Sequence, residues 1–279
     1  MAKRASTEHH VVVGTDFSPS SKVAVMRAIR IAADNHARLH VVHGVGRMPA
    51  ALRRRFGIEE RGSDAKLGRI VEQARASNVR ATPHELALGA TKALRSAARD
   101  VGAELIVVGT RGRALPDMFV GSTAERIAAL SKFPVLLVRH SARGAYREVI
   151  IAADTQGKLV APLRAARFVS PKAELSVLHA YEAPWEASLR LNGANAHAIA
   201  SYRKQACREA RASVMVRMQE AGLDPKTLVL RHGDPRRILH DTRKDALLVM
   251  QRGSVIAHAL LGSVTRSVIE HGQSDVLLL

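Results

Sequence analysis

The chain has 279 residues, of which 47% are hydrophobic and 3% aromatic, enough for one large or two ordinary domains with aliphatic cores. A single cysteine, Cys207, excludes an internal disulfide framework, and the absence of a long apolar stretch excludes a membrane span, so we expect a soluble, cytoplasmic protein with no membrane partner. The net charge of +18 is spread over both halves, and its densest run, Arg53-Arg54-Arg55, has no interleaved aromatic residues, which favours a solvated basic surface over a nucleic-acid interface and leaves attraction to polyanions open.

The first half of the chain alternates short apolar runs with helical patterns. His10–Thr15 predicts a strand, and Ser18-Pro19 then supplies an N-cap followed by proline at the first helical position, so a helix is expected up to about His36. Further strands are expected at Leu39–His43, Ala81–Leu88, Leu105–Val108 and Pro134–Arg139, and further helices over Arg47–Ser77 with a break near Arg61–Ser63, over Thr91–Val101 and from Ser122. This alternation predicts right-handed βαβ units and a parallel sheet.

The strand at Leu105–Val108 is followed by a glycine loop. Gly109 and Gly112 allow positive φ and leave no Cβ to block a ligand, so their N–H groups can point together at a phosphate. Ser122 is a natural N-cap, and Glu125 completes a capping box, so a helix should begin with its positive dipole end facing the loop. These features predict an anion site. The alternative is that the glycines only form a tight turn and Ser122 only caps the helix.

The second half of the chain repeats the first. Val149–Ala153 followed by Asp154 repeats the first strand and its terminal acid, Asp16, and Gly262-Ser263 mirrors Gly121-Ser122. Further strands are expected at Leu175–His179, Thr227–Arg231, Ala246–Met250 and Val276–Leu279. The chain is therefore predicted to be a tandem duplication of an α/β domain, with two five-stranded parallel sheets that carry helices on both faces. The expected segments are a tail at 1–8, a first domain at 9–140, a linker at 141–147 and a second domain at 148–279.

The two copies differ at the glycine loop. Gly109-Thr-Arg-Gly112 becomes Met250-Gln-Arg-Gly253, so the second copy loses the glycine nearest the strand. Its capping box is also lost, because Arg266 stands where the first copy has an acid. We therefore expect the second site to be degenerate.

The chain resembles a tandem universal stress protein from about Glu8 to Leu279. The motifs that carry the resemblance are Val12-Val-Gly-Thr-Asp16-Phe-Ser18, Val41-Val-His43, Gly109-Thr-Arg-Gly112, Gly121-Ser122 and Pro134-Val-Leu-Leu-Val. The stretch Arg113–Val120 is one residue shorter than in the ATP-binding branch of the family, and the second copy shares this departure. The resemblance implies a Rossmann-like domain that binds adenine nucleotides.

The resemblance also implies a set of ATP-binding residues, with Mg²⁺ as an accompanying ion. In the first copy they are Thr15, Asp16, Val41, Gly109, Arg111, Gly112, Gly121, Ser122 and Thr123. In the second copy the matching positions are Asp154, Gly253, Gly262 and Ser263. The physical argument agrees, since ligands of open α/β sheets bind beyond the carboxyl ends of the strands. The alternative for Asp16 is a local hydrogen bond at the turn between strand and helix.

Three functions are compatible with these residues. The first is a nucleotide-responsive regulatory protein that binds ATP in its first domain. The second is a nucleotide-free module in which the two domains pair within the chain and a protein partner is recruited, either as a monomer or as a homodimer. The third is a slow ATPase or a nucleotidyl transferase. No complete P-loop and no nucleophile with a paired base is present, so we expect no catalytic residues and favour binding.

No metal site is expected. His40 and His43 lie three residues apart in one predicted strand, so they face opposite sides of the sheet and cannot hold one ion together.

Overall fold

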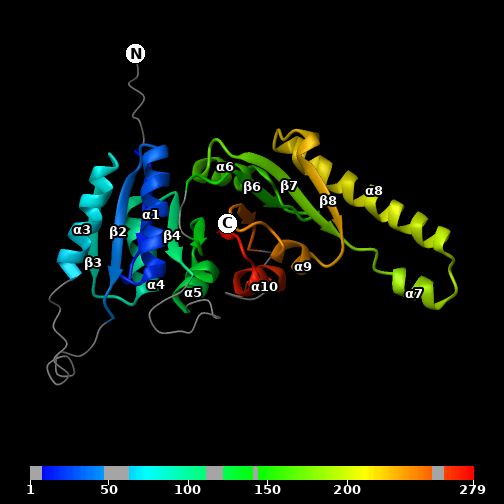
Figure 1. Cartoon of the computed structure of the whole chain (residues 1–279), viewed down its shortest axis with the longest axis horizontal. Coiled ribbons are helices and arrows are strands. Elements are labelled where there is room, and N and C mark those ends of the chain that lie inside the picture. Colours follow the sequence, from blue (N-terminus) through cyan, green and yellow to red (C-terminus); the bar gives the residue numbers. More distant parts are fainter. Residues whose placement is uncertain (1–7, 47–62, 111–121, 141–143, 253–260) are drawn as a thin grey trace, which may run out of the picture. The chain divides into compact units, whose positions relative to one another are not determined.

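The computed structural model describes residues 8–46, 63–110, 122–140, 144–252 and 261–279, and it divides into two compact units, Met1–Ala145 and Tyr146–Leu277 (Figure 1). Each unit is an α/β domain with a parallel sheet, which confirms the predicted fold class. Within the described residues, no helix is both long and apolar enough to cross a bilayer.

The first unit contains five strands in the order β3-β2-β1-β4-β5, and all four neighbouring pairs are parallel. The strands are β1 (His10–Gly14), β2 (Arg38–Gly44), β3 (Ala81–Leu86), β4 (Leu105–Gly109) and β5 (Val135–Val138). The helices are α1 (Pro19–Asp34), α3 (Ser63–Ala76), α4 (Ala90–Val101) and α5 (Ser122–Leu130). The strand order reverses between β1 and β4, and this is where open α/β sheets bind ligands.

Helices cover both faces of this sheet. A Cβ on Gly14 would contact Leu94 of α4, whereas a Cβ on Gly109 would contact Ser20 at the start of α1. Val13 is paired with Val107, so Gly14 and Gly109 point to opposite faces. The central strands are buried on both sides as a consequence, and Val11, Val12 and Val13 have no exposed surface.

Local hydrogen bonds and backbone conformation explain where α1 begins and ends. Ser18 caps α1 by accepting a hydrogen bond from the Ser21 N–H at 3.2 Å. This helix ends at Asp34, two residues earlier than predicted, because the Asn35 side chain bonds the Ile31 carbonyl and His36 adopts a positive φ of 51°. The predicted helix over residues 47–77 is present as α3, and its first part lies outside the described residues.

The second unit repeats this topology with the order β10-β9-β6-β7-β8. Its strands are β6 (Glu148–Ala152), β7 (Glu174–Tyr181), β8 (Leu228–His232), β9 (Leu247–Met250) and β10 (Asp275–Leu278). Its helices are α6 (Val160–Val169), α7 (Glu186–Leu191), α8 (Ala196–Glu220), α9 (Pro235–His240) and α10 (Ser263–His271), with a 3-10 turn at Pro225–Thr227. The predicted tandem duplication is therefore confirmed.

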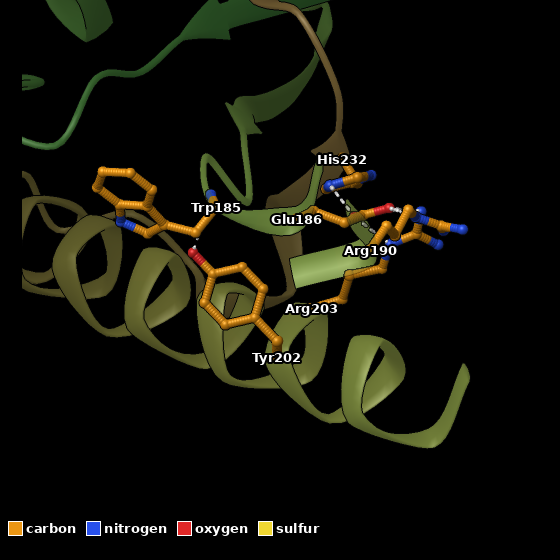
Figure 2. Close-up of polar contacts among 6 residues, drawn as sticks. All are labelled: Trp185, Glu186, Arg190, Tyr202, Arg203 and His232. Carbon is orange, nitrogen blue, oxygen red and sulfur yellow. Dashed lines mark hydrogen bonds and ion pairs between the residues drawn. The ribbon is translucent and has the colours of Figure 1, made fainter. Parts of the chain in front are cut away.

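Helix α7 was not predicted, and a single carboxylate connects it to α8, the helix that contains Cys207. Figure 2 shows Glu186 of α7 between Arg190 of the same helix, Arg203 of α8 and His232 of β8. Both Glu186 oxygens accept hydrogen bonds from Arg203, each at 2.6 Å, and Oε1 also accepts from Arg190 at 2.9 Å. The Arg203 hydrogen bond, followed by that of Arg190, lowers the pKa of Glu186 to about 2.

Three histidines form a row across the first sheet on the face covered by α4. His10 Nδ1 lies 3.1 Å from His40 Nε2, and His40 Nδ1 lies 3.0 Å from His84 Nε2. Burial, followed by the neighbouring charges of His84, His10 and Arg38, lowers the pKa of His40 to about 4, against a raising effect of Glu8. Burial also lowers the pKa of His84, although Asp100 of α4 opposes the shift. His40 and His84 therefore stay neutral at physiological pH.

We predict that replacing Glu186 with Gln loosens α7. The amide cannot form charge-assisted bonds with two guanidinium groups, so α7 should separate from α8 more often. Faster amide exchange over 186–191 and a shift in the fluorescence of Trp185, the chain's one tryptophan, would report this change. The matched control is Glu209→Gln on α8, which contacts Gln205 and should leave both signals unchanged. Equal effects of the two substitutions would contradict the prediction.

We also predict that the histidine row makes the first unit less stable in mild acid. The pKa of His40 is about 4 in the folded chain, below its ordinary value of 6.5, so the unfolded chain binds the proton first as the pH falls below 6.5. After allowance for solvent screening, we expect a loss of about 1 kcal/mol between about pH 7 and about pH 5.

Urea unfolding followed by the methyl resonances of Val12 would measure this loss, with Ile151 as a reporter for the second unit. His40→Leu should reduce the pH dependence of the Val12 transition. An unchanged dependence in this variant would assign the acid sensitivity to other groups.

Candidate functional site

The carboxyl end of β1 turns sharply into α1. The Thr15 hydroxyl accepts a hydrogen bond from the Phe17 N–H at 3.0 Å, and Asp16 Oδ1 accepts one from the Ser18 N–H at 3.0 Å. Asp16 therefore makes the local hydrogen bond considered as an alternative above. This bond does not occupy the whole carboxylate, because an ionised carboxyl group can accept several hydrogen bonds. The turn fixes the direction of the carboxylate at the strand end.

A histidine braces this turn in both units. His43 Nδ1 donates to the Thr15 carbonyl at 2.8 Å, and His179 Nδ1 donates to the Ala153 carbonyl at 2.7 Å. A carbonyl can only accept, so a proton must be on Nδ1. From the sequence, His43 was considered as a metal ligand and as part of the Val41-Val-His43 motif. The recurrence of a histidine at the end of the second strand of each copy was the signal of this shared role. The described residues contain no group of three or more His, Cys, Asp or Glu side chains that could hold a metal.

Gly109 lies at the end of β4, beside the same turn. A Cβ there would lie 2.6 Å from Ser20 Oγ and 2.8 Å from the Ser20 carbonyl oxygen. Gly109 is therefore needed for the close approach of α1 to the sheet, whatever contact its N–H makes with a ligand. The next residue, Thr110, is 2% exposed, and its N–H bonds the Val138 carbonyl.

The remaining predicted residues of the first copy are placed differently. Val41 has no exposed surface and lies within β2, in register with Val13 and Pro83, three residues before the strand ends. Thr123 lies in the first turn of α5, half-buried. Arg111, Gly112 and Gly121 lie outside the described residues.

The helix starts differ from the predicted capping pattern. Helix α5 begins at Ser122, and in the second unit Gly262 is the N-cap, with an extended backbone at φ −56° and ψ 153°, while Ser263 is the first helical residue. The serine that was expected as the cap thus lies one residue inside the helix. A glycine at the N-cap leaves these first N–H groups without a side-chain partner.

The second unit has a cavity of about 410 Å³ at the equivalent place, where β6, β7 and β9 end and α10 begins. The structure brings three predicted residues, Asp154, Gly262 and Ser263, to this cavity, while Gly253 lies outside the described residues. Asp154 Oδ1 accepts hydrogen bonds from the N–H groups of Gln156, at 2.8 Å, and Gly157. The cavity also contacts His179, the counterpart of His43 at the end of β1 in the first unit.

Side chains enter this second cavity where the first copy has glycine and threonine. Met250, which replaces Gly109, is 5% exposed and lines the cavity. The amide of Gln251 bonds the Lys158 carbonyl and lies against Gly157. Burial lowers the pKa of Arg252, the counterpart of Arg111, to about 10, so it stays a cation at neutral pH. The lining of this cavity therefore contains long side chains at two positions where the first copy has glycine and threonine.

Comparisons with a family model and with individual proteins both find universal stress proteins. The model of the family described as "Universal stress protein family" matches residues 8–139 and 145–279. "Universal stress protein A homolog 1" of Coxiella burnetii (strain RSA 493 / Nine Mile phase I) is 29% identical over 136 residues, which cover 46% of this chain and 94% of the relative.

Two solved structures extend the comparison. A functionally unknown protein from Pseudomonas aeruginosa PAO1 has a TM-score of 0.69 at 17% identity and covers 98% of this chain and 92% of its own, which shows the shared fold. A universal stress protein solved in complex with cAMP is 30% identical, with a TM-score of 0.39, over 49% of this chain and all of that chain.

The contact between Gly109 and α1 yields a third prediction. Gly109→Ala should destabilise the first unit by about 1–3 kcal/mol, because the new methyl group meets backbone and not a flexible side chain. Gly68→Ala is the matched control, since nothing lies within 4 Å of its Cβ position in α3. That change should stabilise the helix by about 0.5–1 kcal/mol. Urea unfolding of the full chain would measure both, and the same sign for the two variants would refute the packing argument.

Proposed function

The chain belongs to the universal stress protein family, and from this premise we propose that it binds ATP in its first unit and responds to the nucleotide by changing its affinity for a protein partner. Any such response requires that ATP bind two states of the chain with different affinity. The proposal includes Mg²⁺ as the companion of the phosphates.

The observation that carries the proposal is the position of Asp16. This carboxylate lies at the end of β1, next to the point where the strand order of the first sheet reverses. An acidic side chain at this point can accept hydrogen bonds from ribose hydroxyls. The hydrogen bond from His43 Nδ1 to the Thr15 carbonyl holds the turn of Asp16 rigid, so less conformational entropy is lost when a ligand binds. Gly109, Arg111, Gly112, Gly121, Ser122 and Thr123 are then the groups proposed for the phosphates.

The second unit is proposed to bind ATP more weakly. Met250 adds a long side chain at the strand end, and Gln251 is fixed to Lys158 beside the turn of Asp154. These groups occupy the approach that a triphosphate would use. We therefore propose a stoichiometry of about one ATP per chain. We assign no catalytic residue, and any hydrolysis is proposed to be slow.

An alternative function, interaction with a protein without any nucleotide, is supported by helix α7. Trp185 is 68% exposed and Leu191 is 89% exposed, at the two ends of this short helix. Figure 2 shows the Trp185 ring directed away from the carboxylate of Glu186. Exposed tryptophan is common at the centre of protein interfaces.

The test compares matched substitutions in the two copies. Nucleotide released from freshly purified protein is identified by chromatography, and stripped protein is titrated with ATP and Mg²⁺ by calorimetry, with cAMP as a competing nucleotide. Asp16→Ala should weaken ATP binding by about tenfold or more, because it removes hydrogen bonds to a charged group. Asp154→Ala should leave the affinity unchanged. Undetectable ATP binding would refute the proposal and favour the nucleotide-free function, and equal losses in the two variants would refute the assignment to the first unit.

A further inference from the structure

A second cavity of the first unit lies between helices α1 and α3 and has a volume of about 400 Å³. Its floor is apolar and is formed by Val25 and Met26 of α1 and Ile70 of α3. Met26 is 42% exposed, so part of this apolar surface is open to solvent. The volume is within the range of small-molecule sites. Thr15 lines this cavity and also belongs to the expected ATP site, whereas Lys22, Lys66, Arg69 and the apolar residues of the cavity have no part in the ATP proposal.

Phe17 forms the end of the cavity near β1, and its backbone is strained. Its φ is +62°, a left-handed conformation that is rare for a bulky side chain. Such a conformation is unfavourable and persists only where its surroundings impose it. Here the ring packs against His43, with centroids 4.6 Å apart, and Lys66 Nζ lies 5.3 Å from the ring centroid. The strain keeps an aromatic wall at the end of the cavity.

Three cations surround the apolar floor. Lys22 comes from α1, and Lys66 and Arg69 come from α3, while none of the described residues that line the cavity is a carboxylate. Arg30, Arg38 and Arg80 of the same unit pair with carboxylates. Lys22, Lys66 and Arg69 make no ion pair with any part of the chain that the structure describes. Their positive potential is therefore available to an incoming anion.

We propose that the cavity between α1 and α3 binds an amphipathic anion, with an aliphatic chain on the apolar floor and a carboxylate or phosphate head among Lys22, Lys66 and Arg69. An aliphatic chain matches Val25, Met26 and Ile70, because it removes their exposed surface from water. An anionic head matches the cations, and the guanidinium of Arg69 can bind two oxygens of one head group. Neither part of the ligand would suit the cavity alone.

The test titrates the full-length protein, free of nucleotide, with decanoate and decyl phosphate below their micellar concentrations. Decanol and acetate each lack one part of the proposed ligand. Calorimetry measures affinity, and the methyl resonance of Met26 reports the place of binding. We expect at least one of the two anions to bind and to shift this resonance. The anion that binds more tightly shows whether the site takes a carboxylate or a phosphate head group. Decanol and acetate should each bind at least about tenfold more weakly than this anion.

Variants separate the cavity from the general charge of the chain. Lys66→Glu combined with Arg69→Glu should weaken binding by at least about tenfold, and Arg75→Glu, an exposed site on the same helix outside the cavity, should have little effect. Met26→Gln tests the floor without a change of charge. Three results would each overturn the proposal: no binding of either anion, equal binding of decanol, or equal losses from Arg75→Glu and the double variant. Because no nucleotide is present, failure here is independent of the ATP result.

Discussion

Both units depend on the parallel pairing of two buried strands at the centre of each sheet. In the first unit β1 lies beside β4, with Val11 opposite Leu105 and Val13 opposite Val107. The chain leaves these two strands toward opposite edges of the sheet, so the connections that follow them diverge. Backbone N–H groups and short polar side chains can reach a ligand at this point without crossing the core. The turn of Asp16 and the packing of Gly109 against α1 both follow from the same pairing.

The two copies keep the bracing of this turn and change what surrounds it. His43 and His179 make the same hydrogen bond to a carbonyl at equivalent places. Met250 and Gln251, in contrast, bring side chains into the second cavity. The two copies therefore share the hydrogen bond that holds the strand end in shape and differ in the side chains around it.

Much of this architecture could be predicted because its signals are local. The apolar runs at Val11–Val13 and Leu105–Val108 are strands in the structure, and Ser18 caps the helix that follows it. Within the described residues, the positions of Asp16 and Asp154 at strand ends were predictable, because both residues follow such apolar runs. Val41 was predicted as a ligand contact by resemblance, but the register of β2 buries it completely.

Other features depend on contacts that no local pattern contains. Helix α8 is exposed over most of its surface, so its sequence lacks a clear apolar stripe, and the residues that attach α7 come from three separate elements. The positive φ of Phe17 and the distance between α1 and α3 likewise arise only from tertiary packing.

The histidine row has a consequence for where its protons can be. Each contact between His10, His40 and His84 joins two ring nitrogens and holds one proton, and in the form with three neutral rings each ring carries one proton. If Nδ1 of His10 is protonated, then Nδ1 of His40 and of His84 must be protonated as well. The opposite arrangement puts all three protons on Nε2. The three rings therefore change tautomer together, and only two combined arrangements are possible. A change of tautomer in one ring reverses the direction of both hydrogen bonds.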